Sequence, residues 1–219
     1  MGGPGIIFDQ DETIALTGPM WRRAEELALK SVGHVWTAEL AAKYKGMNAP
    51  DVAATAHRIL KLDIPLAEFQ RRMREALLEG FATLPIEEVP GAVALVRRLN
   101  GLAPMAVASG SPRPAIEKVL SRLGIGSFVP ACVSSEEVPR GKPSPDVFLA
   151  AAKALAADPA RCVVFEDSVI GAQAARAAGM RCIVRPSLKG ACLVGLADLV
   201  VRHWDEVSAE RVVEMIAGG

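Results

Sequence analysis

A series of short apolar runs that alternate with helical patterns constrains the fold more than any other feature. The runs cover residues 5–8, 105–108, 131–133, 162–165 and 182–184, and polar, Gly or Pro residues bound each one. Such runs are typical of strands buried on both faces of a sheet. Helical patterns cover residues 92–99, 115–123, 147–155, 169–178 and 209–216. The alternation predicts an α/β fold, in which a parallel sheet carries helices on both faces.

The segment between the first two runs has a different character, because it contains no convincing strand. Amphipathic helical patterns cover residues 19–30, 37–44, 50–60 and 66–81, and Gly or Pro residues separate them. We therefore expect an all-helical unit of residues 16–86, inserted into an α/β unit of residues 1–15 and 87–219. The two chain crossings are expected near residues 15–18 and 83–90.

Composition narrows the choice of partners. The 219 residues include 25 Lys plus Arg and 25 Asp plus Glu, so the formal net charge is zero. Nucleic acids and anionic membranes select basic surfaces, and no apolar stretch reaches the roughly 18 residues of a membrane span. We expect a cytoplasmic monomer whose main partner is neither a nucleic acid nor a membrane.

Two carboxylates follow the first apolar run. In parallel α/β sheets, ligands bind at the carboxyl ends of the strands. Asp9 and Asp11 are two residues apart, so on an extended chain they point to the same side. Two carboxylates so placed need a cation or a shared proton, and Mg²⁺ takes carboxylate and phosphate oxygens. A solvated turn is the ordinary alternative for this pair.

A hydroxyl and a helix start follow the second run. Ser109 and Gly110 come directly after it, and Ser111 and Pro112 are expected to be the N-cap and the first residue of the next helix. A hydroxyl and unpaired backbone N–H groups at a helix start suit a phosphate. Taken alone, this segment also fits an ordinary helix cap.

Lys142 follows the third run, and Glu166 and Asp167 follow the fourth. A cation on a Pro-flanked loop could neutralise a phosphoryl group, whereas two acids that close an apolar strand need a metal or a basic partner. Each feature has an ordinary alternative, a surface lysine or a solvated acid. Four strand ends that carry acids, a hydroxyl, a lysine and acids in that order indicate phosphoryl transfer.

These segments together resemble the four motifs of the haloacid dehalogenase (HAD) superfamily. The matching segments are Phe8-Asp9-x-Asp11-x-Thr13, Ser109, Lys142 in Gly-Lys-Pro-x-Pro-Asp, and Glu166-Asp167-Ser-x-x-Gly. The helical insert resembles the C1-type cap of the β-phosphoglucomutase and phosphoglycolate phosphatase branch. The resemblance spans nearly the whole chain. It implies a Rossmann-like three-layer core with a helical cap, and a Mg²⁺-dependent phosphatase acting on a small phosphorylated metabolite, such as a sugar phosphate or a glycolate-like ester.

The resemblance also implies a role for each motif residue. Asp9 would be the nucleophile that becomes an aspartyl phosphate, and Asp11 the general acid and base. Phosphate would be bound by Thr13, Ser109, Gly110 and Lys142, the last of which offsets its charge. Mg²⁺ would be held by Asp9, the backbone carbonyl of Asp11, Asp167 and, directly or indirectly, Glu166.

Departures from the family pattern leave alternatives open. Glu12 stands where most members have Gly, which adopts positive φ at no cost. The insert lacks the arginine and histidine of the mutases, which disfavours a β-phosphoglucomutase-like activity. A non-catalytic phosphoacceptor or a degenerate member is a third possibility. Candidate substrate contacts are Trp21, Lys45, Asn48, Ser111 and Arg113, although Trp21 also fits helix packing.

Overall fold

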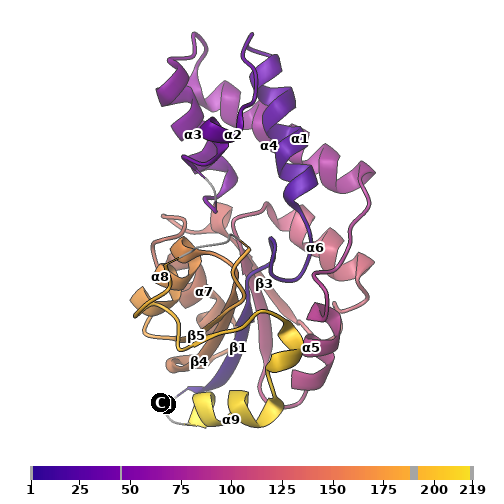
Figure 1. The fold of residues 1–219 in the computed structure, drawn as a ribbon, viewed down its shortest axis with the longest axis vertical. Helices are drawn as coiled ribbons and strands as arrows, with labels where there is room; N and C mark the ends of the chain where they lie inside the picture. Colours follow the sequence, from indigo (N-terminus) through magenta and orange to yellow (C-terminus); the bar gives the residue numbers. More distant parts are fainter. Residues whose placement is uncertain (1, 45, 188–191, 218–219) are drawn as a thin grey trace.

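A six-stranded parallel sheet forms the centre of the computed structural model, which describes residues 2–44, 46–187 and 192–217 (Figure 1). The strands are β1 (Gly3–Phe8), β2 (Met105–Ser109), β3 (Ala131–Ser134), β4 (Ala157–Glu166), β5 (Arg181–Val184) and β6 (Leu199–Val200). Their order across the sheet is β3-β2-β1-β4-β5-β6, and all neighbours are parallel. Five strands confirm the predicted runs, whereas β6 is too short to give an apolar run.

Helices cover both faces of the sheet, which confirms the predicted α/β class. One face is covered by α5 (Ala92–Leu99), α6 (Arg113–Arg122) and α9 (Ala209–Ala217), and the other by α7 (Asp146–Ala154) and α8 (Val169–Ala177). Successive residues of β1 alternate between the two apolar cores, because side chains on a strand point to opposite faces. Ile6 and Phe8 pack into one core and Ile7 into the other.

Four helices lie between β1 and α5 and form what we call the helical block. They are α1 (Gly18–Lys30), α2 (Ala38–Ala41), α3 (Ala49–Leu60) and α4 (Leu66–Thr83). The block lies at the top of Figure 1, over the edge of the sheet where β1 ends. The helix expected over residues 37–44 is shorter than predicted. Thr37 is its N-cap, and residues 42–44 form turns that lead towards Gly46, whose φ is +84°.

The two chain crossings between the block and the sheet are hydrogen-bonded to each other. The backbone N–H of Leu16 donates to the carbonyl of Glu87 at 2.9 Å, and that of Val89 donates to Ile14 at 2.8 Å. The apolar core of the block continues into the core on one face of the sheet. The division into residues 1–15 with 87–219 and residues 16–86 stays a prediction.

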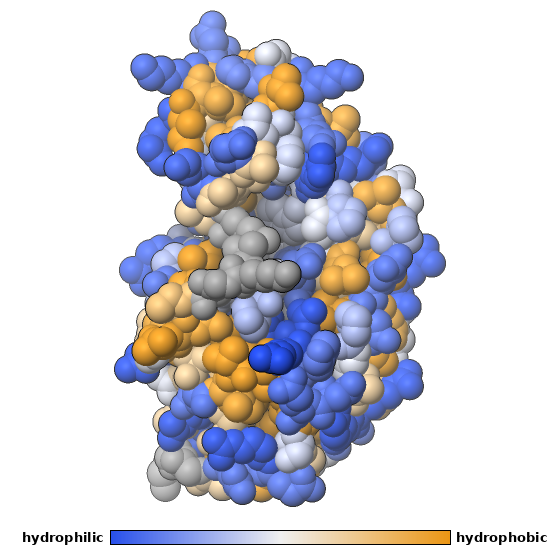
Figure 2. All heavy atoms as spheres, in the orientation of Figure 1, coloured by the Kyte–Doolittle hydropathy of each residue, from blue (hydrophilic) through white to orange (hydrophobic). Residues whose placement is uncertain are grey.

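The surface in Figure 2 is mostly hydrophilic, with smaller hydrophobic areas between the polar side chains. Within the described residues, no helix is both long enough and apolar enough to cross a bilayer. Phe8, Phe165 and Trp204 are among the largest fully buried side chains, and Phe8 stacks on Phe165 with ring centroids 4.7 Å apart. Trp204 meets Phe165 edge-on, so one aromatic cluster lies beneath the end of β1.

Trp204 allows a test of this core. Its side chain is 1% exposed, and its indole N–H donates to the backbone carbonyl of Thr13 at 2.9 Å. Trp204→Phe removes this donor and part of the buried volume, so we expect the free energy of unfolding in urea to fall by about 2 kcal/mol. The control Val213→Ala, on the exposed side of α9, should change it by less than about 0.5 kcal/mol. Equal effects of the two changes would contradict this assignment.

Candidate active site

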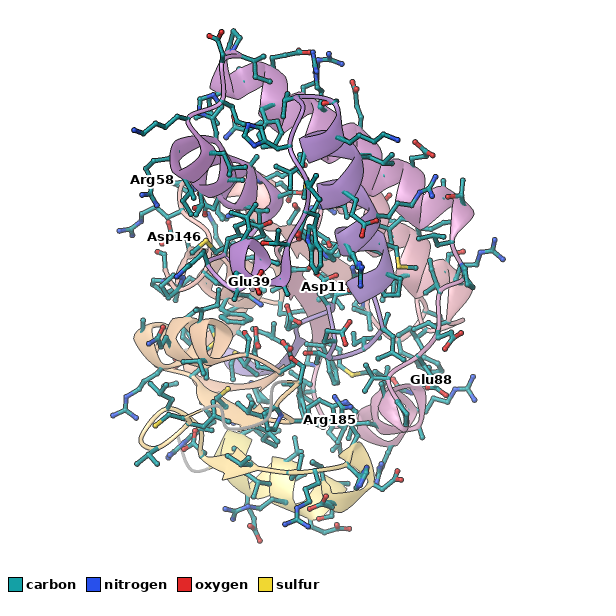
Figure 3. The ribbon with its side chains drawn as sticks, turned by 45° about the horizontal axis from the view of Figure 1, so that its top comes forward. Asp11, Glu39, Arg58, Glu88, Asp146 and Arg185 are labelled. Carbon is teal, nitrogen blue, oxygen red and sulfur yellow. The ribbon has the colours of Figure 1, made fainter. Side chains whose placement is uncertain are left out.

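The predicted strand-end residues converge at one edge of the sheet. Asp9 follows β1, Ser109 ends β2 and Glu166 ends β4, and these three strands are neighbours. Since parallel strands end at the same edge, their terminal side chains meet there. Lys142 reaches this edge from the segment between β3 and α7. In Figure 3, Asp11 lies between the helical block and the sheet.

Lys142 forms the central ion pair of this site. Its Nζ lies 2.6 Å from Asp9 Oδ1 and 2.7 Å from Glu166 Oε1, and all three side chains are buried. Burial alone would lower the pKa of Lys142, but the two carboxylates raise it above its usual range. A buried ammonium is tolerable when it is paired in this way. Lys142 is therefore a fixed positive charge in direct contact with Asp9.

Three buried acids could hold a metal ion. Asp9, Glu166 and Asp167 offer carboxylate oxygens that all lie within 4.8 Å of one another. Burial raises the pKa of Asp9 to about 8, although Lys142 opposes the shift. Burial and the neighbouring charges of Glu166 and Asp9 also raise the pKa of Asp167 well above its usual range. Asp9 Oδ2 is buried with no hydrogen-bond partner among the described residues. Oxygen donors with excess negative charge fit Mg²⁺.

Glu166 has both carboxylate oxygens engaged. Oε1 accepts from Lys142, and Oε2 accepts from the backbone N–H groups of Asp167 and Ser168 and from the Ser168 hydroxyl, at 2.8–2.9 Å. Ser168 in turn is the N-cap of α8. A Cβ at Gly171 would lie 1.7 Å from Glu166 Oε1, which explains the glycine three residues after Ser168. Glu166 thus orients Lys142 and the start of α8, whereas Asp9 Oδ2 has no hydrogen-bond partner among the described residues.

The Asp11 carboxylate is held by donors from two parts of the chain. Ser109 and Ser111 donate their hydroxyls to it from the β2 side, at 2.7 Å and 3.0–3.1 Å. Thr17 Oγ1 and Trp21 Nε1 donate to it from the helical block, at 2.7 Å and 3.1 Å. Four side-chain donors thus engage the carboxylate of Asp11, which is not among the three acids that could hold a metal ion, so a metal contact of Asp11 would involve its backbone carbonyl, as the resemblance implies.

The segment between Asp9 and the helical block contains two buried polar side chains that have no hydrogen-bond partner in the described part of the chain. Thr13 Oγ1, a predicted phosphate contact, makes no hydrogen bond with the described residues. The amide of Gln10 is also unpaired, and Gln10 is fully buried. Burying an unpaired polar group is costly, so these groups are candidates for ligand or water contacts. Gln10 was not predicted, because nothing in the pattern distinguishes it from a spacer between Asp9 and Asp11.

Glu12 has a positive φ, the backbone conformation that a Gly at this position would adopt at no cost. Its φ is +60°, a conformation that costs a non-glycine residue about 1–2 kcal/mol. The side chain offsets part of this cost, since its Oε1 accepts from the backbone N–H of Gly18 at 2.8 Å, at the start of α1. Glu12 also lines the cavity that contains Asp9.

A cavity of about 690 Å³, which we call the site cavity, joins the sheet edge to the helical block. From the sheet side it is lined by Asp9, Asp11, Gly110, Lys142, Glu166 and Asp167. From the helical block it is lined mainly by apolar and aromatic side chains of α1 and the segment around α2. A second cavity of about 800 Å³ lies between α3 and the segment before α7, and Lys142 borders both. The site cavity is the one that contains Asp9.

The candidate substrate contacts have different environments. Trp21 lines the site cavity and donates to Asp11. The expectation that Ser111 is the N-cap of α6 is wrong. Pro112 takes that position, and the Ser111 hydroxyl turns to Asp11 instead. Lys45 lies outside the described residues.

Asn48 and Arg113 are engaged by the protein itself. Asn48 is buried and caps α3 through its Oδ1, and a Cβ at Gly141 would lie 1.8 Å from its Nδ2. Asn48 thus packs the helical block against the sheet edge, on the side of the second cavity. The Arg113 guanidinium binds the carbonyl of Cys132 and the carboxylate of Glu137.

Comparisons of sequence identify a family and its relatives. The family model described as a haloacid dehalogenase-like hydrolase matches residues 4–179. Fructose-1-phosphate phosphatase YqaB of Escherichia coli (strain K12) is 34% identical over 180 residues, which cover 80% of this chain and 93% of that protein. Hexitol phosphatase B of Escherichia coli (strain K12) is 33% identical over 202 residues, covering 83% and 82%.

Solved structures include close matches to the whole fold. CbbY from Rhodobacter sphaeroides in complex with phosphate superposes with a TM-score of 0.84 and 26% identity, over 98% of this chain and 100% of that chain. A CbbY mutant in complex with xylulose-(1,5)bisphosphate gives a TM-score of 0.82 and 27% identity, over 94% and 96%. Such coverage includes the helical block as well as the sheet.

The central ion pair can be tested through stability. Lys142→Ala leaves Asp9 and Glu166 buried without their cation, and we expect the free energy of unfolding in EDTA to fall by about 3–5 kcal/mol. Addition of Mg²⁺ should recover part of the loss, because a ligand that binds the folded state stabilises it. The matched control Lys153→Ala, exposed on α7, should have little effect. Urea unfolding measures all three proteins, and a Lys142→Ala variant as stable as the control would contradict the assignment.

Proposed function

The chain belongs to the haloacid dehalogenase-like hydrolases, and on that premise we propose a Mg²⁺-dependent phosphatase that hydrolyses a small sugar phosphate through an aspartyl phosphate on Asp9. The observation that carries the proposal is the convergence of Asp9, Asp11 and Lys142 on one cavity. Relatives named as phosphatases of fructose 1-phosphate and hexitol phosphates support the substrate class.

The first step transfers the phosphoryl group to Asp9. A carboxylate oxygen of Asp9 attacks phosphorus, the bond between phosphorus and the ester oxygen breaks, and Asp11 gives a proton to that oxygen. Lys142, 2.6 Å from Asp9, offsets the charge on the phosphoryl oxygens. The Ser109 hydroxyl, which donates to Asp11, would turn to the phosphoryl group when substrate binds.

The second step releases phosphate and restores the enzyme. Asp11, now ionised, takes a proton from a water molecule whose oxygen attacks phosphorus. The bond between phosphorus and the Asp9 oxygen breaks, which yields inorganic phosphate and the free Asp9 carboxylate. The donors that surround Asp11, from Thr17 and Trp21 to the β2 side, would hold its carboxylate in one orientation in both steps.

Mg²⁺ would be held by Asp9, Asp167 and the backbone carbonyl of Asp11. Bound there, it would offset the negative charge of the phosphoryl group and orient it. The unpaired Oδ2 of Asp9 and the raised pKa of Asp167 support a cation at this position. Glu166 would act indirectly, because its oxygens already bind Lys142 and the start of α8.

The helical block, residues 16–86, would act as a cap over the core of residues 1–15 and 87–219. It covers the site cavity, so a closed block excludes bulk water and strengthens the electrostatic contribution of Lys142. It also limits the leaving group to one that fits a cavity of about 690 Å³. We therefore infer that the substrate is a small metabolite rather than a phosphoprotein.

Metal dependence is the first functional test. We expect steady hydrolysis of p-nitrophenyl phosphate with Mg²⁺ and none in EDTA, with recovery when Mg²⁺ is restored. Ca²⁺ should inhibit, because it prefers more ligands and a looser geometry. Full activity in EDTA would contradict the metal assignment, and absence of turnover on a panel of phosphometabolites would favour a non-catalytic member.

The two aspartates should separate by role. Asp9→Asn should abolish turnover and the acid-labile phosphoenzyme, since the nucleophile is lost. Asp11→Asn should lower kcat by about 10²–10⁴-fold on a sugar phosphate, with a smaller loss on p-nitrophenyl phosphate, whose leaving group needs no proton. Rapid quench with labelled substrate measures both. Unchanged kcat for Asp11→Asn on the sugar phosphate would overturn its role, and isomerisation of β-glucose 1-phosphate would indicate a mutase.

A further inference from the structure

The part of the site cavity inside the helical block has an aromatic wall with a single acid. Trp21, Trp36 and Tyr44 line it together with Glu25. Much of the remaining lining is apolar, from residues such as Leu16, Ala38, Ala41, Met47 and Val52. The leaving group of a bound ester would occupy this space, because the phosphoryl group belongs beside Asp9 and Lys142 at the opposite end.

Glu25 lines the site cavity, and the protein engages one of its two carboxylate oxygens. It lies on α1 and is 9% exposed, and its Oε2 accepts from Trp36 Nε1 at 2.5 Å and from the Tyr44 hydroxyl at 3.1 Å. Its Oε1 has no hydrogen-bond partner among the described residues, where both bonds to Glu25 are made through Oε2. Because Glu25 lines the site cavity, Oε1 is the oxygen that a bound molecule would meet.

Two charged side chains of the helical block line this part of the cavity. Among the described residues of the helical block that line the cavity, Glu25 is the one acid and Arg22 the one cation. Arg22 lies over the ring of Trp36, and its Nε pairs with Glu26 at 2.8 Å. Glu26 therefore offsets the charge of Arg22, whereas Glu25 faces the cavity without a cationic partner in the described part of the chain.

We propose that Glu25 determines the specificity of the site, by accepting a hydrogen bond from a hydroxyl of the leaving group and by repelling a leaving group that carries a second phosphate. The inference rests on the proposed function and names its substrate class, a singly phosphorylated polyol or sugar. A buried acceptor that loses its donor disfavours analogues without the hydroxyl. A carboxylate that meets a phosphate discriminates against it by repulsion.

Mannitol phosphates give a clean test, because mannitol 1-phosphate and mannitol 1,6-bisphosphate differ only by the second phosphate. We expect wild-type kcat/KM to favour the monophosphate, and Glu25→Gln to reduce that preference by about tenfold or more, since the amide keeps an acceptor oxygen but loses the charge. The matched control is Glu39→Gln, which removes an equal charge from an exposed residue of α2 that does not line the site cavity. It should leave the preference within about twofold of wild type.

A second comparison tests the hydrogen bond. Wild type should favour mannitol 1-phosphate over hexyl phosphate, which lacks hydroxyls, and Glu25→Ala should lose about tenfold or more of that preference. If the Glu25 variants do not fold, the role of Glu25 is tested instead by inhibition of the wild-type enzyme. Mannitol 1,6-bisphosphate should then inhibit p-nitrophenyl phosphate hydrolysis at least about tenfold more weakly than mannitol 1-phosphate.

The outcomes separate the two proposals. Absence of hydrolysis of any phosphate ester by wild type would overturn the phosphatase and this inference together. Hydrolysis by wild type with unchanged preferences in Glu25→Gln and Glu25→Ala, or equal inhibition by the two mannitol phosphates, would overturn the role of Glu25 alone. Loss of bisphosphate turnover in Arg22→Ala would assign the second-phosphate contact to Arg22 and overturn the repulsion by Glu25.

Discussion

Lys142 places one ammonium 2.6 Å from Asp9 and 2.7 Å from Glu166, where the protein shields all three groups from water. Buried carboxylates at the ends of adjacent strands would repel each other, so this cation allows β1 and β4 to end side by side in acids. Glu166 extends the contact, because its second oxygen binds the backbone at the start of α8. The charge of Lys142 thus positions β1, β4, its own loop and the start of α8. A divalent metal would neutralise the negative charge that remains on the acids Asp9, Glu166 and Asp167.

The sheet and the convergence of the site could be predicted because both depend on patterns that are local in sequence. A strand buried on both faces must be apolar throughout, and parallel strands must end at the same edge. Asp9, Ser109, Lys142 and Glu166 therefore meet as expected. The β6 strand could not be predicted, since two residues supply no pattern, and the early start of β4 runs through polar residues such as Asp158.

The side-chain contacts that finish the site depend on segments far apart in sequence, and sequence patterns do not contain them. Ser111 suits an N-cap by type, but Asp11 lies close enough to bind its hydroxyl, and α6 begins after Pro112. Arg113 is drawn to Glu137 by an ion pair across 24 positions. Glu25 resembles any helix-surface acid in the sequence. It becomes distinctive only because Trp36 and Tyr44 bury it.

Helix α1 connects the chemistry of the site with the choice of substrate. Trp21 and Glu25 are four residues apart, so they lie on one face of the helix, and both line the site cavity. Trp21 donates to Asp11, the group proposed to exchange protons with the leaving oxygen, whereas Glu25 meets the far end of the leaving group. A shift of α1 would move both contacts at once. A leaving group that does not fit against Glu25 would therefore also disturb the position of Asp11, so that selection acts on turnover as well as on binding.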